Sequence, residues 1–162
     1  MTGCSTWGTA RRVARWAAPA SSRPPTSARA TAARRRASGP YGACSTDPTR
    51  ARAPATALPV EPIQPDDGWC DAAGDPAYNR PVKLPYPASA ERMWRTEDEA
   101  YDVVVVLGHN DEPVVDGLGS AIFLHLRKPG YTPTEGCVAL APDDMAAFLA
   151  AAKPGDAVEI RL

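Results

Sequence analysis

The sequence predicts a mainly β domain with one short helix, preceded by a disordered N-terminal segment. Residues 103–106 are four consecutive valines, a run typical of a strand that is buried on both faces. Apolar residues recur at helical spacing after Pro142, and at no other place as clearly. The first 57 residues contain almost no large apolar side chains, so they cannot bury enough surface to fold.

The N-terminal segment, residues 1–57, differs from the rest of the chain in charge as well as in hydropathy. It holds ten arginines, no lysine and a single acid, Asp47, whereas the remainder holds eight basic and eighteen acidic residues. Val13 is its only large aliphatic residue. We therefore predict two regions: a low-complexity, disordered segment at 1–57 and a folded domain at 58–162.

Three hypotheses address the origin and role of this segment. Arg11 and Arg12 precede no apolar stretch, so the segment is not a credible signal peptide. The run Arg34–Arg36 is a solvated charge run, and a basic arm that binds nucleic acid is the least favoured alternative. An arginine-rich sequence without lysine is also what GC-rich DNA encodes in a shifted reading frame. In that case the domain at 58–162 lacks its first strands.

The folded region begins with extended and loop-like sequence. Residues 59–68 are rich in proline, and Trp69 and Tyr78 are aromatic anchors in predicted loops. We expect both rings to cover the edge of the core, with a lining of a substrate groove as the alternative. Residues 89–95 predict a short helix or strand.

The central part of the domain is predicted to be a pair of antiparallel strands, at 101–107 and 121–126. His109 follows the first strand closely, and His125 lies near the end of the second. His109 either bonds a backbone carbonyl at a strand end or supports a site around His125. No transmembrane stretch, phosphate-binding loop or dinucleotide fingerprint occurs in the sequence.

The C-terminal part predicts a strand, a helix and a last strand. A short strand at 138–140 is followed by Pro142, which is favoured at the first position of a helix, and by two acids that suit the helix N-terminus. The buried face of this helix is predicted to consist of Met145, Phe148, Leu149 and Ala152. Pro154 and Gly155 end the helix, and residues 157–162 alternate as a final strand.

Between the strands at 121–126 and 138–140, a histidine and a cysteine point to acyl-transfer chemistry. A cysteine is nucleophilic as a thiolate, and an imidazole is a common base for producing it. Because the loop after His125 returns the chain to a neighbouring strand, His125 and Cys137 are expected to meet. Gly136 allows close approach of a substrate, and amides near Cys137 could hold an oxyanion. The alternative is a structural cysteine and a core histidine.

The segments F-L-H-L at 123–126 and T-E-G-C-V-A-L at 134–140 resemble the catalytic region of the L,D-transpeptidases of the YkuD type. The resemblance spans about residues 58–162 and implies a β-sandwich with one short helix after the nucleophile. It implies that Cys137 is the nucleophile and His125 the proton acceptor and donor, with Gly136 and Thr134 shaping the loop and no metal or organic cofactor.

The same resemblance implies a function, which is peptidoglycan cross-linking on stem tetrapeptides as donor and acceptor. It further implies location in the cell envelope or periplasm and sensitivity to carbapenems. Transfer to water would make the protein an L,D-carboxypeptidase. A catalytically silent fragment or envelope-binding module of the same fold is the alternative from another class.

The chain departs from the commonest family motif at two positions. Glu135 stands where the family has a histidine, and Ala139 stands where it has an arginine. The sequence therefore resembles a divergent branch, and binding of a substrate carboxylate would pass to another cation: Arg127, Lys128 or Arg80.

The cysteines allow two further readings. Two cysteines and two histidines could together supply the four ligands of a zinc site: Cys70, Cys137, His109 and His125. No pair of them has the close spacing of a structural zinc site. A disulfide between Cys70 and Cys137 would remove the proposed nucleophile.

Overall fold

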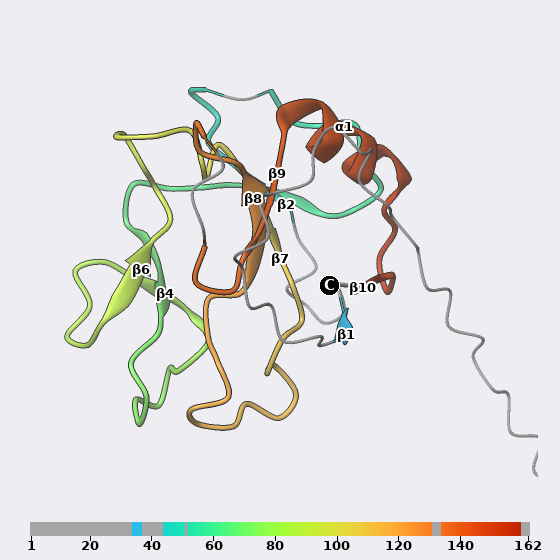
Figure 1. Cartoon of the computed structure of the whole chain (residues 1–162). Helices are drawn as coiled ribbons and strands as arrows, with labels where there is room; N and C mark the ends of the chain where they lie inside the picture. Colours follow the sequence, from blue (N-terminus) through green and yellow to red (C-terminus); the bar gives the residue numbers. More distant parts are fainter. Residues whose placement is uncertain (1–33, 37–43, 51, 131–133, 160–162) are drawn as a thin grey trace, which may run out of the picture.

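A computed structural model describes residues 34–36, 44–50, 52–130 and 134–159 of the chain (Figure 1). Its main element is a five-stranded sheet in the order β3-β2-β7-β8-β9. The pairs β2/β7 and β7/β8 are antiparallel, whereas β2/β3 and β8/β9 are parallel. The strands are β2 (Cys44–Thr46), β3 (Val60–Pro62), β7 (Val103–Val106), β8 (Phe123–Leu126) and β9 (Val138–Leu140).

A second, three-stranded sheet has the order β5-β4-β6, with both pairs antiparallel. Its strands are β4 (Asp67–Cys70), β5 (Pro81–Lys83) and β6 (Ala90–Arg92). A short antiparallel pair joins β1 (Arg34–Arg36) to β10 (Ala157–Glu159). The predicted mainly β fold with one short helix is confirmed.

The central sheet buries both faces, as the valine run predicts. Val104 and Val106 pack with Phe123 and Trp69 in a cluster that joins the two sheets. Val105 faces the opposite way and packs with Leu124 and other residues against α1 (Pro142–Ala151). The three-stranded sheet and the helix thus cover opposite sides of the five-stranded sheet (Figure 1). Side chains alternate along a strand, so neighbouring valines serve two different cores.

The helix begins and packs as the sequence predicts. Pro142 occupies the start of α1, and acids lie in its first turn. The predicted apolar face is buried, consisting of Met145, Phe148, Leu149 and Ala152. No helix among the described residues has the length and apolarity needed to cross a membrane.

The N-terminal segment contains strands that composition did not predict. Most of residues 1–43 lie outside the described part of the chain, so disorder there stays a prediction, as does the boundary after Ala57. Further on, β2 pairs with both β3 and β7, and Thr46 and Asp47 are buried. Strand pairing uses backbone groups, and a short strand between two neighbours needs few apolar side chains of its own.

Two regions that the sequence predicts to be loops also contain strands. Trp69 lies in β4, and the chain after Tyr78 enters β5. The segment predicted as a helix or strand at 89–95 contains β6. Glycine, proline and aspartate are poor strand formers, so local sequence does not reveal these strands. Trp69 is 6% exposed and packs in the core between the sheets, as expected. Tyr78 is 7% exposed and lines a pocket, which agrees with the alternative for this ring.

Asn79 links the second sheet to the loops around β8. Its side-chain oxygen accepts hydrogen bonds from the Trp69 indole at 3.1 Å and from the Ala121 amide at 3.3 Å. Its side-chain nitrogen donates to the carbonyls of His109 and Asn110 at 2.8 and 2.7 Å. Its φ of 56° lies in the left-handed region that asparagine tolerates better than most residues.

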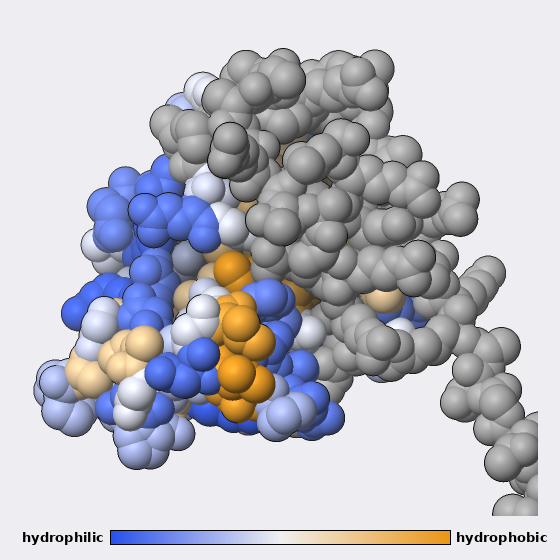
Figure 2. All heavy atoms as spheres, turned by 60° about the horizontal axis from the view of Figure 1, so that its bottom comes forward, coloured by the Kyte–Doolittle hydropathy of each residue, from blue (hydrophilic) through white to orange (hydrophobic). Residues whose placement is uncertain are grey.

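The coloured part of the face in Figure 2 is mostly hydrophilic, with one small hydrophobic group. The large apolar residues left exposed in the described chain are Val60 and, in the β7–β8 loop, Val115 and Leu118. Scattered exposed apolar residues are normal for a soluble protein surface.

Replacing Asn79 should destabilise the fold strongly. In Asn79→Ala the Trp69 indole and the Ala121 amide lose their acceptor, and each unsatisfied buried donor costs roughly 1–3 kcal/mol. We therefore expect the free energy of unfolding, measured by urea denaturation, to fall by about 3 kcal/mol. Asn79→Gly also loses the side-chain hydrogen bonds, but glycine adopts the left-handed conformation without strain. Comparing the two variants therefore separates the cost of backbone strain from the cost of the lost bonds.

The matched control is Gln64→Ala, because Gln64 is an exposed amide with one long side-chain contact of 3.5 Å. It should change the free energy of unfolding by less than about 0.5 kcal/mol. An equal loss in Asn79→Ala and Gln64→Ala would contradict the assigned role of Asn79.

Candidate active site

The parallel pairing of β8 with β9 places the predicted histidine and cysteine on one face of the sheet. His125 is the register partner of Ala139, and Leu124 is the partner of Val138. Cys137 directly precedes β9, so it lies level with Phe123. Since side chains alternate, Phe123, His125 and Cys137 point to the same side, toward the three-stranded sheet.

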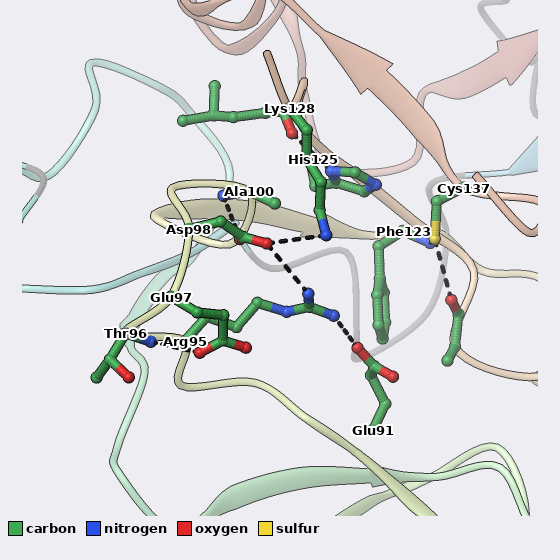
Figure 3. Close-up of polar contacts among 12 residues, drawn as sticks. Glu91, Arg95, Thr96, Glu97, Asp98, Ala100, Phe123, His125, Lys128 and Cys137 are labelled. Atoms are coloured by element: carbon green, nitrogen blue, oxygen red, sulfur yellow. Dashed lines mark hydrogen bonds and ion pairs between the residues drawn. The ribbon is translucent and has the colours of Figure 1, made fainter. Parts of the chain in front are cut away.

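His125 and Cys137 line one pocket of about 530 Å³. The ring of His125 extends toward Cys137 in Figure 3. His125 is 5% exposed, and Cys137 is partly buried against the core between the sheets. The pocket is also lined by Tyr78, Glu91, Arg95, Tyr101, Lys128, Thr134 and Glu135. A pocket of this size accommodates a peptide segment.

The hydrogen bonding of His125 determines which ring nitrogen carries the proton. Nδ1 lies 2.7 Å from the carbonyl oxygen of Leu126. A carbonyl oxygen only accepts, so Nδ1 donates and the neutral ring leaves Nε2 as an acceptor. The imidazole is thereby held in the tautomer that a base acting through Nε2 requires.

The surroundings of His125 favour the neutral ring. Burial lowers its pKa below the ordinary value of 6.5, and the nearby positive charges of Arg95 and Lys128 act in the same direction. The Leu126 carbonyl and the Asp98 carboxylate act in the opposite direction without reversing the effect. A neutral imidazole is the form that can accept a proton from a thiol.

The thiol of Cys137 lies between two backbone groups at the start of β8. Sγ donates to the carbonyl of Ala121 at 3.3 Å and accepts from the amide of Phe123 at 3.4 Å. The amide contact remains favourable for a thiolate, whereas the carbonyl contact requires the thiol proton. Ala121 itself has a left-handed φ of 55°, a conformation that costs energy and directs its carbonyl to the sulfur.

Thr134 and Gly136 shape the turn that leads to the cysteine. The Thr134 hydroxyl donates to the carbonyl of Cys137 at 2.6 Å. Gly136 has a φ of 113°, and a Cβ atom at this position would lie 3.1 Å from Ile122 Cδ1. The backbone conformation therefore calls for glycine here, and a larger residue would also require the end of the Ile122 side chain to shift.

His109 lies elsewhere. Its Nε2 is 2.9 Å from the carbonyl of Leu118, and it does not line the pocket of His125 and Cys137. A Cβ atom on Gly119 would come within 2.8 Å of this ring nitrogen. This contact corresponds to the first of the two expectations for His109, a histidine that bonds a backbone carbonyl.

Of the three cations considered in place of the family arginine, Lys128 lines the pocket, and Arg80 and Arg127 do not. Arg80 donates to the carbonyl of Asp111 at 2.8 Å. Sequence reasoning missed Arg95, which enters the pocket from the segment between β6 and β7. Nothing in the local sequence distinguishes Arg95 from the other arginines, because only the tertiary fold brings it to His125.

The remaining cysteine and metal hypotheses can be compared with the described residues. Neither Cys70 nor Cys137 forms a disulfide within the described residues, and burial raises the pKa of the Cys70 thiol. Within the described part of the chain, no three His, Cys, Asp or Glu side chains gather as ligands of a metal ion would.

The geometry defines a class: a mainly β protein in which a cysteine and a histidine on adjacent parallel strands share a pocket. A family model of the L,D-transpeptidase catalytic domain (YkuD) matches residues 16–160. The chain belongs to this family, whose members act on peptidoglycan peptides. No curated protein and no solved structure gives a significant match.

The titration of His125 provides a direct test of its surroundings. We expect its imidazole to titrate below pH 6.5 in the folded protein, because the buried ring resists protonation. The stability that the protein gains from a neutral His125 is fully present above about pH 6.5. It is lost as the pH falls toward the lower pKa of the folded state. NMR titration of the ring signals, assigned with His125→Gln, measures the pKa, and a value of 6.5 or higher would refute this account.

Proposed function

We propose that this protein is a cysteine L,D-transpeptidase that cross-links peptidoglycan stem peptides. The observation that carries the proposal is the shared face of β8 and β9, from which His125 and Cys137 line one pocket. Family membership supports the reaction class and the substrate class. The proposal adds the donor, a stem tetrapeptide, and the roles of individual residues.

In the acylation step, Nε2 of His125 accepts the proton of the Cys137 thiol. The sulfur then attacks the carbonyl carbon of the third residue of the donor, and an oxyanion forms. Backbone amides near Gly136 and Cys137 stabilise this negative charge. The terminal D-alanine leaves as an amine after His125 returns the proton, and the donor remains bound to the sulfur as a thioester.

In the second step, an acceptor amine attacks the thioester carbonyl. Its excess proton passes to His125 and then to the departing thiolate, so a new amide forms and the thiol is regenerated. If water attacks instead, the product is a shortened stem peptide and the reaction is that of an L,D-carboxypeptidase. Both reactions use the same residues and no cofactor, and we place them in the cell envelope, where the family's substrate lies.

One observation favours a second candidate, a catalytically silent module of the same fold. The Cys137 thiol donates to the Ala121 carbonyl, which favours the protonated form. The chain also has Ala139 where the commonest family motif has arginine. Such a module would bind peptidoglycan without forming a thioester.

Incubation with a carbapenem distinguishes the two candidates. The sulfur of Cys137 attacks the β-lactam carbonyl, the ring C–N bond breaks, and the ring nitrogen takes a proton. We expect intact-mass spectrometry to show one adduct with the mass of the whole carbapenem, located on Cys137 by peptide mapping. His125→Ala should slow adduct formation by about 100-fold or more, because general base catalysis contributes on that scale.

The controls are Cys137→Ala and Cys70→Ala. Cys137→Ala should form no adduct and make no cross-linked product from a stem tetrapeptide, while its circular dichroism stays that of a folded domain. Cys70→Ala removes the buried cysteine of β4 and should retain the adduct. Turnover in Cys137→Ala would end the proposal, and a folded wild-type protein without adduct would favour the silent module.

A further inference from the structure

Arg95 is a charged residue of the pocket whose two terminal nitrogens face carboxylates, while its Nε is buried without a hydrogen-bond partner among the described residues. Its Nη2 forms an ion pair with Glu91, and its Nη1 lies 3.6 Å from the carboxylate of Asp98. Asp98 is in turn paired with Lys128 at 2.9 Å and accepts a hydrogen bond from the Ala100 amide (Figure 3). Both terminal nitrogens of Arg95 thus already face carboxylates, so the guanidinium is not a vacant receptor for a substrate carboxylate.

The segment that carries Arg95 is itself held from the N-terminal side of the chain. Nη1 of Arg50 donates to the carbonyls of Arg95 and Asp98 at 3.0 and 2.9 Å, and its Nε lies 3.4 Å from Asp102. These contacts cross more than forty positions of sequence. They fix the backbone from Arg95 to Asp98, directly after the Arg95 side chain.

The guanidinium of Arg95 stacks on the ring of Tyr101, which in turn contacts the proposed base. Arg95 Cζ lies 4.0 Å from the centre of the Tyr101 ring, a cation–π geometry. Tyr101 meets the imidazole of His125 edge-on at a centroid distance of 5.4 Å and meets Phe123 at 6.0 Å. Tyr101 is therefore confined by a guanidinium, an imidazole and a phenyl ring.

We propose that Arg95 is a positioning residue for the acyl-transfer reaction, which holds Tyr101 against the His125 imidazole and keeps a fixed positive charge beside that base. This inference rests on the proposed function for its chemical consequence. Its geometric part, the stack Arg95–Tyr101–His125, is independent of the substrate.

Several charged groups face His125, and their signs decide the effect of removing Arg95. Arg95 and Lys128 disfavour a protonated imidazole, and Asp98 favours it. Burial raises the pKa of the Tyr101 hydroxyl, which therefore stays neutral at physiological pH, and Cys137 faces the same space. Without Arg95, the negative charge of Asp98 and Glu91 is less compensated, so the pKa of the His125 imidazole rises.

The experiment compares wild type with Arg95→Gln by two readouts. NMR titration of His125 in the free protein should show its pKa moved upward. Carbapenem acylation, followed by stopped-flow fluorescence, should lose rate mainly at low pH. We expect the ratio of acylation rates at pH 8 and pH 6 to rise roughly threefold, the scale of a partly screened charge near the base.

Two further variants keep the test decisive. Arg95→Lys retains the charge but not the planar stack, so it should keep the titration close to wild type while acylation slows at every pH. This variant alone decides the proposal if Arg95→Gln does not fold. Arg92→Gln is the matched control, an exposed arginine on the neighbouring strand, and should change neither readout.

An unchanged His125 titration in folded Arg95→Gln, or wild-type acylation in Arg95→Lys, would overturn the proposal. Failure of the proposed function looks different. In that case no carbapenem adduct forms in any variant, whereas the NMR titration of His125 still reports on Arg95.

Discussion

The candidate site depends on the parallel register between β8 and β9. Because Ala139 is the partner of His125, the cysteine two residues earlier falls on the same face as the histidine. A slip of one residue would turn Cys137 toward α1 and bury it in the other core. That register is in turn secured by Leu124 and Leu140, which pack under the helix on the opposite face. The apolar core thus fixes the geometry of the polar site.

The wall of the pocket opposite these strands combines apolar packing with paired charges. Its segment, residues 91–101, has little regular structure. Met93, Ala100 and Tyr101 are buried in the core between the sheets, and ion pairs and the Arg50 bonds to backbone carbonyls hold the rest. Charged groups paired in a half-buried place can be strong when their hydrogen-bonding geometry is fixed. One side of the pocket is therefore held by apolar packing under the helix, and the other by apolar packing together with paired charges.

Sequence reasoning succeeded where the information is local. The valines of β7, the F-L-H-L segment of β8 and the apolar spacing of α1 each carry a periodicity that predicts their element. It did not reveal β2 or β4, whose residues form strands because neighbouring strands supply the hydrogen bonds. Likewise the local motif indicated His125 and Cys137, whereas Arg95 and Asn79 reach their partners only through tertiary contacts.

The turn before Cys137 places two neighbouring positions under different physical constraints. Gly136 has a positive φ of 113°, which favours glycine, and a Cβ atom there would also require the end of the Ile122 side chain, 3.1 Å away, to shift slightly. Glu135 is exposed and meets neither restriction. Adjacent positions of one loop thus tolerate different substitutions. Position 135 is an exposed part of the pocket lining, where a change of side chain alters the charge at the rim, whereas position 136 needs glycine for the path of the backbone.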